Sequence, residues 1–360
     1  PRISSSSRVP RSPTWWSAPK PDLRHDGGVL LFIPSPPISG WQIGPVFIHI
    51  YALCLITGMI AAAYVGGRRW RERGGISEIF ENTILIAIPI GIVGARIYHV
   101  FTHMGDYFGP GHMNPWAIWE GGIAIYGAVG AGALAALIAA NKQGVRFSSM
   151  ADALAPGIIL GQAIGRLGNW FNQELYGLPT TQPWGLEIDA AHRVAGYEQY
   201  ATFHPTFLYE LLWNLLVFGV LLWADKRWAL GRGKLFALYV ALYTAGRIVT
   251  EQVRIDYSYD TFGPIRFNTA AAILFCLIAI GVFLWMLKAK PGREDSVYLS
   301  PDWEAKVVAK YAKESEAKAA KAKSPQAKAT EGNSAPAAAT KPATPEADAQ
   351  SAKADDAAQE

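Results

Sequence analysis

Four polar residues lie close together at the end of a long apolar stretch: Arg166, Asn169, Asn172 and Glu174. The arginine and the two asparagines recur at steps of three, so a helix places them on roughly one face. A charged side chain at the centre of a membrane helix costs at least about 2.5 kcal/mol unless a partner or water satisfies it. The cluster therefore predicts a site that binds a charged ligand.

A second polar stripe follows about eighty positions later. Tyr243, Arg247, Glu251 and Arg254 are spaced by four, four and three residues, so they share one helix face. Glu251 is one turn from Arg247 and is predicted to pair with it. The planar guanidinium donates two parallel hydrogen bonds to phosphate, so both arginines favour a phosphate-bearing ligand.

Three more polar residues fall at similar depth in other apolar segments: Arg96, Tyr51 and Tyr126. Together with Arg166 and Arg247 they predict a polar cavity in the outer leaflet, lined by three guanidiniums. The alternative is that each arginine reaches the outer interface on its own, or pairs with a carboxylate for structural reasons.

The composition of the chain predicts the kind of secondary structure that carries these polar residues. The chain has 360 residues, of which 51% are hydrophobic and only 17% charged, whereas soluble proteins carry about 25% charged residues. Apolar windows of membrane-spanning length predict an all-α integral membrane protein with seven transmembrane helices, near 46–66, 83–101, 122–141, 150–170, 207–224, 233–251 and 268–288.

Loop charges orient these helices. Lys and Arg are concentrated after spans one, three, five and seven, including Arg68, Arg69, Arg71 and Arg73 after the first. The positive-inside rule then places the C-terminus in the cytoplasm and the start of span one outside.

The two ends differ from the membrane domain, which is predicted over 29–290. Residues 1–28 are basic and rich in Ser and Pro, which conflicts with an external N-terminus. They are predicted to be a disordered extension, and we hypothesise that translation starts near Val29. Residues 291–360 are rich in Ala, Lys, Glu and Pro and predict a disordered cytoplasmic tail, in which 303–323 could form a helix.

The segment between spans four and five, 171–206, is too long for a simple connector and predicts a small external cap. His204 at its end is a candidate proton acceptor, although a packing role at the start of the next helix is also open. Glu210 lies in the first turns of span five, where burial of a charge is costly. The histidines near residues 99–112 lack the carboxylates of a metal site, so no metal is expected.

At these residues the chain resembles the prolipoprotein diacylglyceryl transferase family. The stretch from Gly165 to Glu174 is similar to that family's glycine-arginine-x-glycine-asparagine motif. Further agreement, in the right order, covers Pro45 to Tyr51, Gly94 to Ile97, Trp119 to Gly122, His204 to Leu211 and Gly246 to Arg254. The chain departs from the family at Tyr126, where many members have histidine, and at Phe207, where many have glutamine.

The resemblance implies transfer of a diacylglyceryl group from phosphatidylglycerol to the lipobox cysteine of a prolipoprotein signal peptide, with release of glycerol phosphate. It implies a multi-pass protein of the bacterial cytoplasmic membrane that needs no cofactor, metal or nucleic acid.

The resemblance also implies residue roles. Arg166 and Arg247 would bind the lipid phosphate, and Asn172 the headgroup. Asn169 and Glu174 would orient either the headgroup or Arg166, and Glu251 would orient Arg247. The remaining lining residues would be Arg96, Tyr51, Tyr126 and Tyr243. His204, Glu210 and substrate-assisted deprotonation all stay open as the means of activating the thiol.

Two other function classes remain. The same arginines could line the pore of an anion transporter or channel, or the protein could be a non-catalytic lipid-binding scaffold. We find no internal repeat between the two halves, and polar groups thin out toward the cytoplasmic side, which favours a site open to one leaflet over a transport path.

Overall fold

The computed structural model describes residues 32–108, 114–117, 121–122, 124–256, 260–262 and 265–322. Helices dominate, and the short strands form three two-stranded antiparallel pairs. The proposed extension 1–28 and the tail beyond 322 lie outside the described residues. The elements are β1 (Gly40–Ile43), β2 (Val46–His49), α1 (Ile50–Glu72), α2 (Ser77–Thr102), α3 (Met104–Tyr107), α4 (Ile125–Lys142), α5 (Phe147–Asn172), β3 (Leu186–Glu187), η2 (Ala190–His192), β4 (Thr202–Phe203), α6 (Thr206–Trp228), α7 (Lys234–Glu251), β5 (Asp260–Phe262), β6 (Ile265–Arg266), α8 (Phe267–Ala289) and α9 (Pro301–Ala322).

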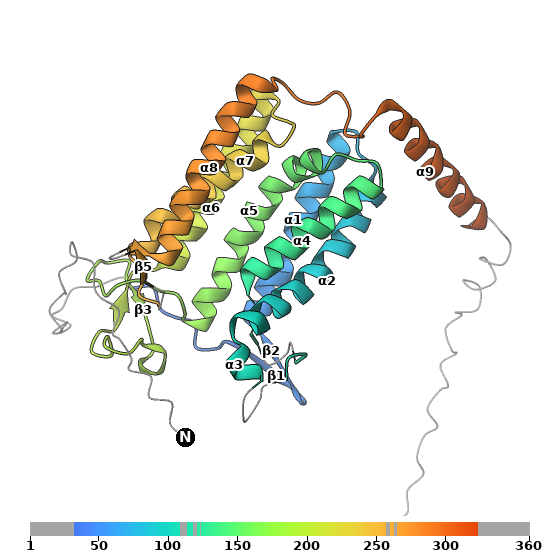
Figure 1. Ribbon diagram of the computed structural model, residues 1–360. Helices are drawn as coiled ribbons and strands as arrows, with labels where there is room; N and C mark the ends of the chain where they lie inside the picture. The colour runs from blue at the N-terminus through green and yellow to red at the C-terminus, as the bar shows by residue number, and fades with distance from the viewer. Residues whose placement is uncertain are drawn as a thin grey trace, which may run out of the picture. The chain divides into compact units, whose positions relative to one another are not determined.

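Six helices in the described part of the chain are long and apolar enough to cross a membrane, namely α1, α2, α4, α5, α6 and α8. They confirm six of the seven predicted spans. The seventh, 233–251, forms α7, but its Lys234, Arg247 and Glu251 keep it out of this apolar group. The short strands lie at one end of the helices (Figure 1).

Glycines let the helices approach closely. A Cβ atom on Gly58 of α1 would lie 2.7 Å from the carbonyl oxygen of Gly161 on α5. A Cβ atom on Gly127 of α4 would lie 2.4 Å from the carbonyl oxygen of Gly94 on α2. Small residues at such contacts are typical of helix pairs in membranes. The result is two tight pairs, α1 with α5 and α2 with α4.

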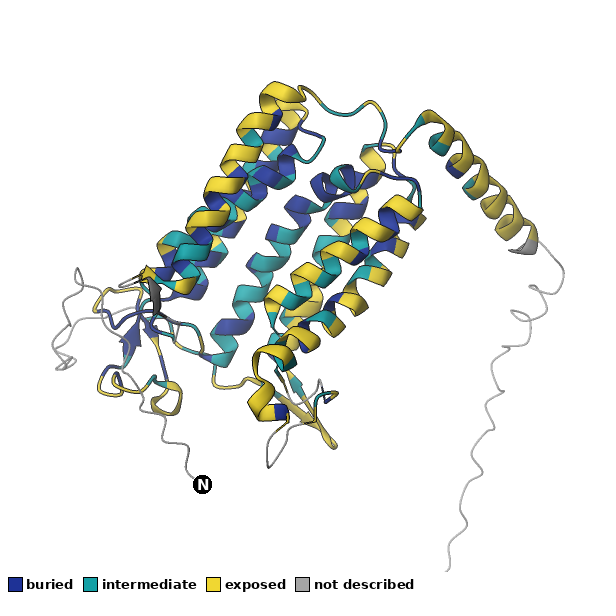
Figure 2. Ribbon diagram, in the orientation of Figure 1, coloured by how far each residue is buried: buried dark blue, intermediate teal, exposed yellow. Residues whose placement is uncertain are grey.

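The packing of the helices determines which of their residues are buried. Figure 2 shows exposed residues along much of α2, α4 and α8, and α5 is the most buried of the six apolar helices. Many of the exposed side chains are large and apolar, such as Leu85 at 70% and Leu277 at 64% relative accessibility. A surface of this kind suits contact with lipid rather than water.

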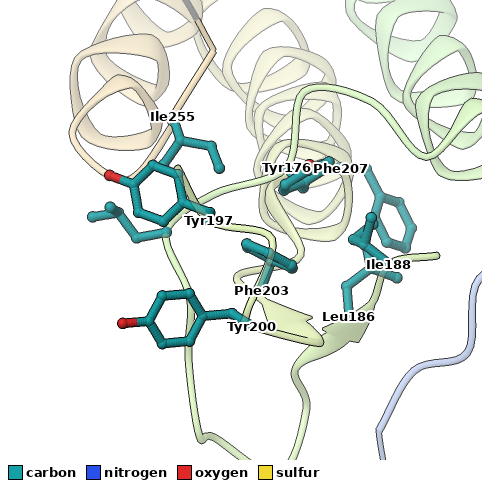
Figure 3. Packing of buried hydrophobic residues seen from close by; sticks show 9 residues of the cluster. Tyr176, Leu186, Ile188, Tyr197, Tyr200, Phe203, Phe207 and Ile255 are labelled. Atoms are coloured by element: carbon teal, nitrogen blue, oxygen red, sulfur yellow. The ribbon is translucent and has the colours of Figure 1, made fainter. Parts of the chain in front are cut away.

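The segment between α5 and α6 has a hydrophobic cluster of its own. Tyr176, Ile188 and Phe203 are buried there, and the rings of Tyr176 and Phe203 lie 4.7 Å apart (Figure 3). Ile255, which follows α7, packs into the same cluster. The strands β3 and β4 pair within it, with Leu186 opposite Phe203. The segment is therefore folded and attached to the ends of three helices.

The first compact unit of the structure continues past the predicted boundary at residue 291, as far as Val307. The amide of Arg146 donates to the carbonyl of Val297 (2.8 Å), and the amide of Leu299 donates to that of Gly144 (2.9 Å). The polar composition of this segment did not indicate that it is folded, although its Val297 and Tyr298 are buried. The helix expected in the tail is present as α9, whose later part belongs to a second unit that begins at Val308.

Candidate functional site

A single carboxylate joins the two predicted arginines. Glu210 of α6 forms an ion pair with Arg166 of α5, whose Nε lies 2.6 Å from Oε2, and its Oε1 accepts from Arg247 Nη1 of α7 (2.6 Å). Glu210 is only 5% exposed, whereas each guanidinium-bearing side chain is 18% exposed. The structure thus brings Arg166 and Arg247 together, as predicted, and adds the residue that holds them.

Local packing sets the distance between α6 and α7. The indole of Trp213 on α6 donates to the carbonyl of Leu242 on α7 (3.0 Å). A Cβ atom on Gly246 would lie 2.2 Å from that indole nitrogen. Only a glycine next to Arg247 lets the helices approach so closely, and this places Glu210 within reach of Arg247.

The end of α7 carries a second layer of ion pairs. Glu251 accepts from Arg247 Nη2 (2.6 Å) and from Asn268 Nδ2 of α8 (3.2 Å), as expected for its role in orienting Arg247. Arg266 Nη2 lies 3.4 Å from Glu251, and Arg266 also donates to the carbonyl of Arg254 (2.8 Å). These contacts fix the place where α7 ends.

Arg254 connects this second layer of ion pairs to Glu210. It pairs with Asp256 (2.7 Å) and lies 3.6 Å from Glu210 Oε1. The ion pairs thus connect the guanidiniums of Arg166, Arg247, Arg254 and Arg266 to the carboxylates of Glu210, Glu251 and Asp256.

The end of α5 forms a relay of hydrogen bonds. Arg166 Nη1 donates to Asn169 Oδ1 (3.2 Å), and Asn169 Nδ2 donates to Glu174 Oε1 (2.9 Å). Asn172 Nδ2 donates to the same oxygen (3.3 Å). The helix stops at Gln173, whose φ of 52° is left-handed, and this turn folds Glu174 back toward Asn169. All four predicted polar residues of this run therefore lie together.

The two arginines keep donors for a ligand. Among the contacts of the described residues, Arg166 Nη2 and Arg247 Nε have no protein acceptor. Both side chains are partly exposed. A phosphate oxygen can therefore accept from them without breaking the bridge to Glu210.

The three predicted tyrosines approach the same region from different helices. A Cβ atom on Gly168 would lie 2.5 Å from the Tyr51 ring, so α1 packs this tyrosine against the arginine run of α5. Tyr126 of α4 interacts electrostatically with Arg247, Glu251 and Tyr243. The ring of Tyr243 itself lies 6.0 Å from that of Tyr239. The polar groups of α1, α4, α5, α6 and α7 thus meet at one end of the helices.

Arg96 requires a correction. Its guanidinium donates to four backbone carbonyls, those of Asn114, Pro115, Gly121 and Gly122 (2.5–3.1 Å), and is 3% exposed. It also lies 5.0 Å from the Tyr107 ring centre. Its donors are consumed by the connection between α2 and α4, so it is not a third guanidinium of the arginine network. Position along the helix could not show which way its side chain points.

His204 belongs to a different group of contacts. Its Nδ1 lies 3.1 Å from the hydroxyl of Tyr209, which also accepts from Trp184 Nε1 (3.0 Å). Burial lowers the pKa of His204, so the imidazole is neutral near pH 7. Over the described ranges no hydrogen bond or ion pair links His204 to the arginines, and its catalytic role stays a prediction.

Asp256, Arg266 and Asn268 of the network were not predicted from the sequence. Arg254 was expected only as part of the polar stripe on its helix, and Glu210 only as a candidate for activating the thiol. Glu210 carried a signal, as a charge near the start of an apolar helix, but nothing in its spacing identified its partners. Arg266 and Asn268 lie at the start of α8, and in the sequence nothing distinguishes them from ordinary loop and helix-start residues. Within the described chain, no three His, Cys, Asp or Glu side chains gather as a metal site.

Comparison with known proteins identifies the family. The family described as prolipoprotein diacylglyceryl transferase matches residues 39–286. The phosphatidylglycerol–prolipoprotein diacylglyceryl transferase of Cutibacterium acnes is 52% identical over 267 residues, covering 74% of this chain and 90% of the relative. The Corynebacterium diphtheriae enzyme of the same name is 48% identical over 278 residues, covering 74% and 96%. The match includes the helices that carry Arg166, Glu210 and Arg247, and the chain belongs to the prolipoprotein diacylglyceryl transferase family.

Proposed function

We propose that this protein transfers the diacylglyceryl group of phosphatidylglycerol to the cysteine thiol of a prolipoprotein lipobox. The observation that carries the proposal is the bridge from Arg166 through Glu210 to Arg247, with guanidinium donors left over. The names of the relatives favour this reaction over anion transport. In the reaction a carbon–sulfur bond forms at the glycerol carbon, the bond from that carbon to the phosphate oxygen breaks, and glycerol phosphate leaves.

The arginine network fits the needs of the leaving group. Negative charge on the phosphate increases as the carbon–oxygen bond breaks, and preorganised donors stabilise that charge in the transition state. Glu210, Glu251 and Asn169 hold the two guanidiniums before substrate binds. Little reorganisation is then needed during the reaction.

The same network bears on thiol activation. Both oxygens of Glu210 are engaged by guanidiniums, Oε2 by Arg166 and Oε1 by Arg247. The positive charge of these guanidiniums favours the thiolate of the incoming cysteine. We therefore assign Glu210 to positioning the arginines and thiol activation mainly to the guanidiniums.

The membrane arrangement is also part of the proposal. We place α7 as a seventh span beside the six apolar helices, because it packs against α6 and α8 and carries its charges near its two ends. The basic ends of α1, α6 and α8 face the cytoplasm in this arrangement. The folded segment between α5 and α6 is then an external cap beside the site.

The test uses purified protein, labelled phosphatidylglycerol and a lipobox peptide. We expect labelled diacylglyceryl peptide from the native protein and none from Arg166→Ala, with both proteins equally inserted in the membrane. A peptide with serine in place of the lipobox cysteine is the matched control and should stay unlabelled. Absence of product from the native protein, beside an active relative, would disprove the transferase function.

A further inference from the structure

A groove of about 400 Å³ lies between α1 and α2, near the turn that connects them and remote from the arginine network. Its walls include Tyr64 and Leu85, which are 68% and 70% exposed, and Phe80, which is buried. Ligand sites begin at about 300 Å³, so the groove has room for a small ligand or a lipid headgroup.

Helix packing explains why the groove exists. α1 packs mainly on α5, and α2 packs mainly on α4, so these consecutive helices contact each other only slightly. The turn between them is held by Trp70, whose indole donates to the carbonyl of Ile76 (2.8 Å). Gly67 forms part of the groove without a side chain to fill it. The groove is thus preformed, and it separates the two tight helix pairs.

The polar groups in the groove lack protein partners. Arg71, Ser77 and Glu81 line it, and across the described part of the chain none of their side chains makes a hydrogen bond or ion pair. The neighbouring arginines differ, because Arg68 pairs with Glu72 (2.9 Å) and Arg69 with Asp225 (2.7 Å).

Arg71 is directed into the groove rather than away from it. A Cβ atom on Gly67 would lie 3.9 Å from Arg71 Nη1, so the guanidinium lies close to the groove floor. Since Glu81 lines the same groove without pairing with Arg71, the two opposite charges are available to one ligand that carries both signs.

We propose that this groove binds a zwitterionic phospholipid of the inner leaflet. Its phosphate accepts from Arg71 and Ser77, its ammonium group donates to Glu81, and an acyl chain follows Tyr64 and Leu85 into the bilayer. Glu81 repels a purely anionic headgroup, which gives the site its selectivity. A lipid bound there joins the α1–α5 pair to the α2–α4 pair.

Binding of short-chain phosphatidylethanolamine to the delipidated full chain in detergent tests the proposal, with native mass spectrometry as the readout. A hydrogen bond to a charged group contributes about 1.5–3 kcal/mol, so Arg71→Gln and Glu81→Gln should each weaken binding about tenfold or more. Gly67→Val should also weaken it by filling the floor. Arg68→Gln is the matched control, because Arg68 lies outside the groove lining and is already paired, and it should bind like the native chain.

A second arm tests headgroup selectivity with phosphatidylglycerol in an Arg166→Ala background, which removes the proposed substrate site. We expect the Arg166→Ala chain to bind phosphatidylglycerol weakly, and to bind it more tightly when Glu81→Gln is added. Equal binding of both lipids to the Arg166→Ala chain would overturn the assignment of a zwitterionic ligand. An equal loss in Arg68→Gln and Arg71→Gln, or no loss in Glu81→Gln, would overturn the site itself.

Discussion

Glu210→Gln is the most direct test of the bridge between the two arginines. The substitution keeps the size of the side chain but removes the charge that both guanidiniums contact at 2.6 Å. Removing one partner from a buried ion pair costs about 3–5 kcal/mol, because the remaining charge is left without compensation. We expect a stability loss of that order, since Glu210 is 5% exposed.

The expected loss of activity in Glu210→Gln exceeds the loss that lower stability alone would cause. Without the carboxylate, Arg166 and Arg247 repel each other and move apart, and a displacement of about 1 Å at a reacting centre can cost about 100-fold in rate. We expect turnover of the folded protein to fall by about that factor. Glu210→Asp keeps the charge but is one methylene too short to reach both guanidiniums, so it should recover activity only in part.

The assay measures initial rates of peptide lipidation at saturating phosphatidylglycerol, together with the midpoint of thermal unfolding. Asn214→Ala is the control, because Asn214 is buried one turn further along α6 and its Nδ2 has no partner among the described residues. It should retain near-native turnover. Native-like turnover in Glu210→Gln would refute the bridge as a positioning device, as would an equal loss in Asn214→Ala.

Three further predictions address other parts of the site. Arg166→Lys should lower turnover about 100-fold, because an ammonium group cannot replace donors that serve Glu210, Asn169 and the phosphate at once; turnover within threefold of native, in the lipidation assay, would show that charge alone suffices. Arg96→Gln should lower the unfolding free energy by about 3 kcal/mol or more through lost bonds to carbonyls and leave the KM for phosphatidylglycerol unchanged; a raised KM in a stable variant would restore Arg96 to the binding site. Burial lowers the pKa of His204 below 6.5, so the unfolded chain binds this proton more tightly and stability falls as the pH drops through 6.5. His204→Gln should make the pH dependence of thermal unfolding shallower while keeping at least a tenth of the activity; complete inactivity with intact folding would instead assign the thiol base to His204.

The positions of the helices followed from local sequence patterns. Long apolar segments predicted six helices that the structure confirms as apolar enough for a membrane, and helical spacing correctly paired Arg247 with Glu251. The polar run from Arg166 to Glu174 was also a reliable signal, because charges are rare in apolar helices unless they have a function. These properties depend on residues that are close along the chain.

Contacts between helices could not be predicted in the same way. Depth along an apolar segment placed Arg96 and Arg166 at similar levels, but the rotation and packing of each helix decided that one binds loop carbonyls and the other binds Glu210. Likewise, composition predicted disorder from residue 291, whereas residues 297–299 pair with residues 144–146 in the structure.

By itself, the sequence determined which helices form, which of them carry guanidiniums, and which family the chain resembles. Tertiary structure alone decided that Glu210 joins Arg166 to Arg247 and that Arg96 lies outside their network. The physical reason is that hydrophobicity and helical period act over a few residues, whereas an ion pair requires two side chains from different helices to reach the same point.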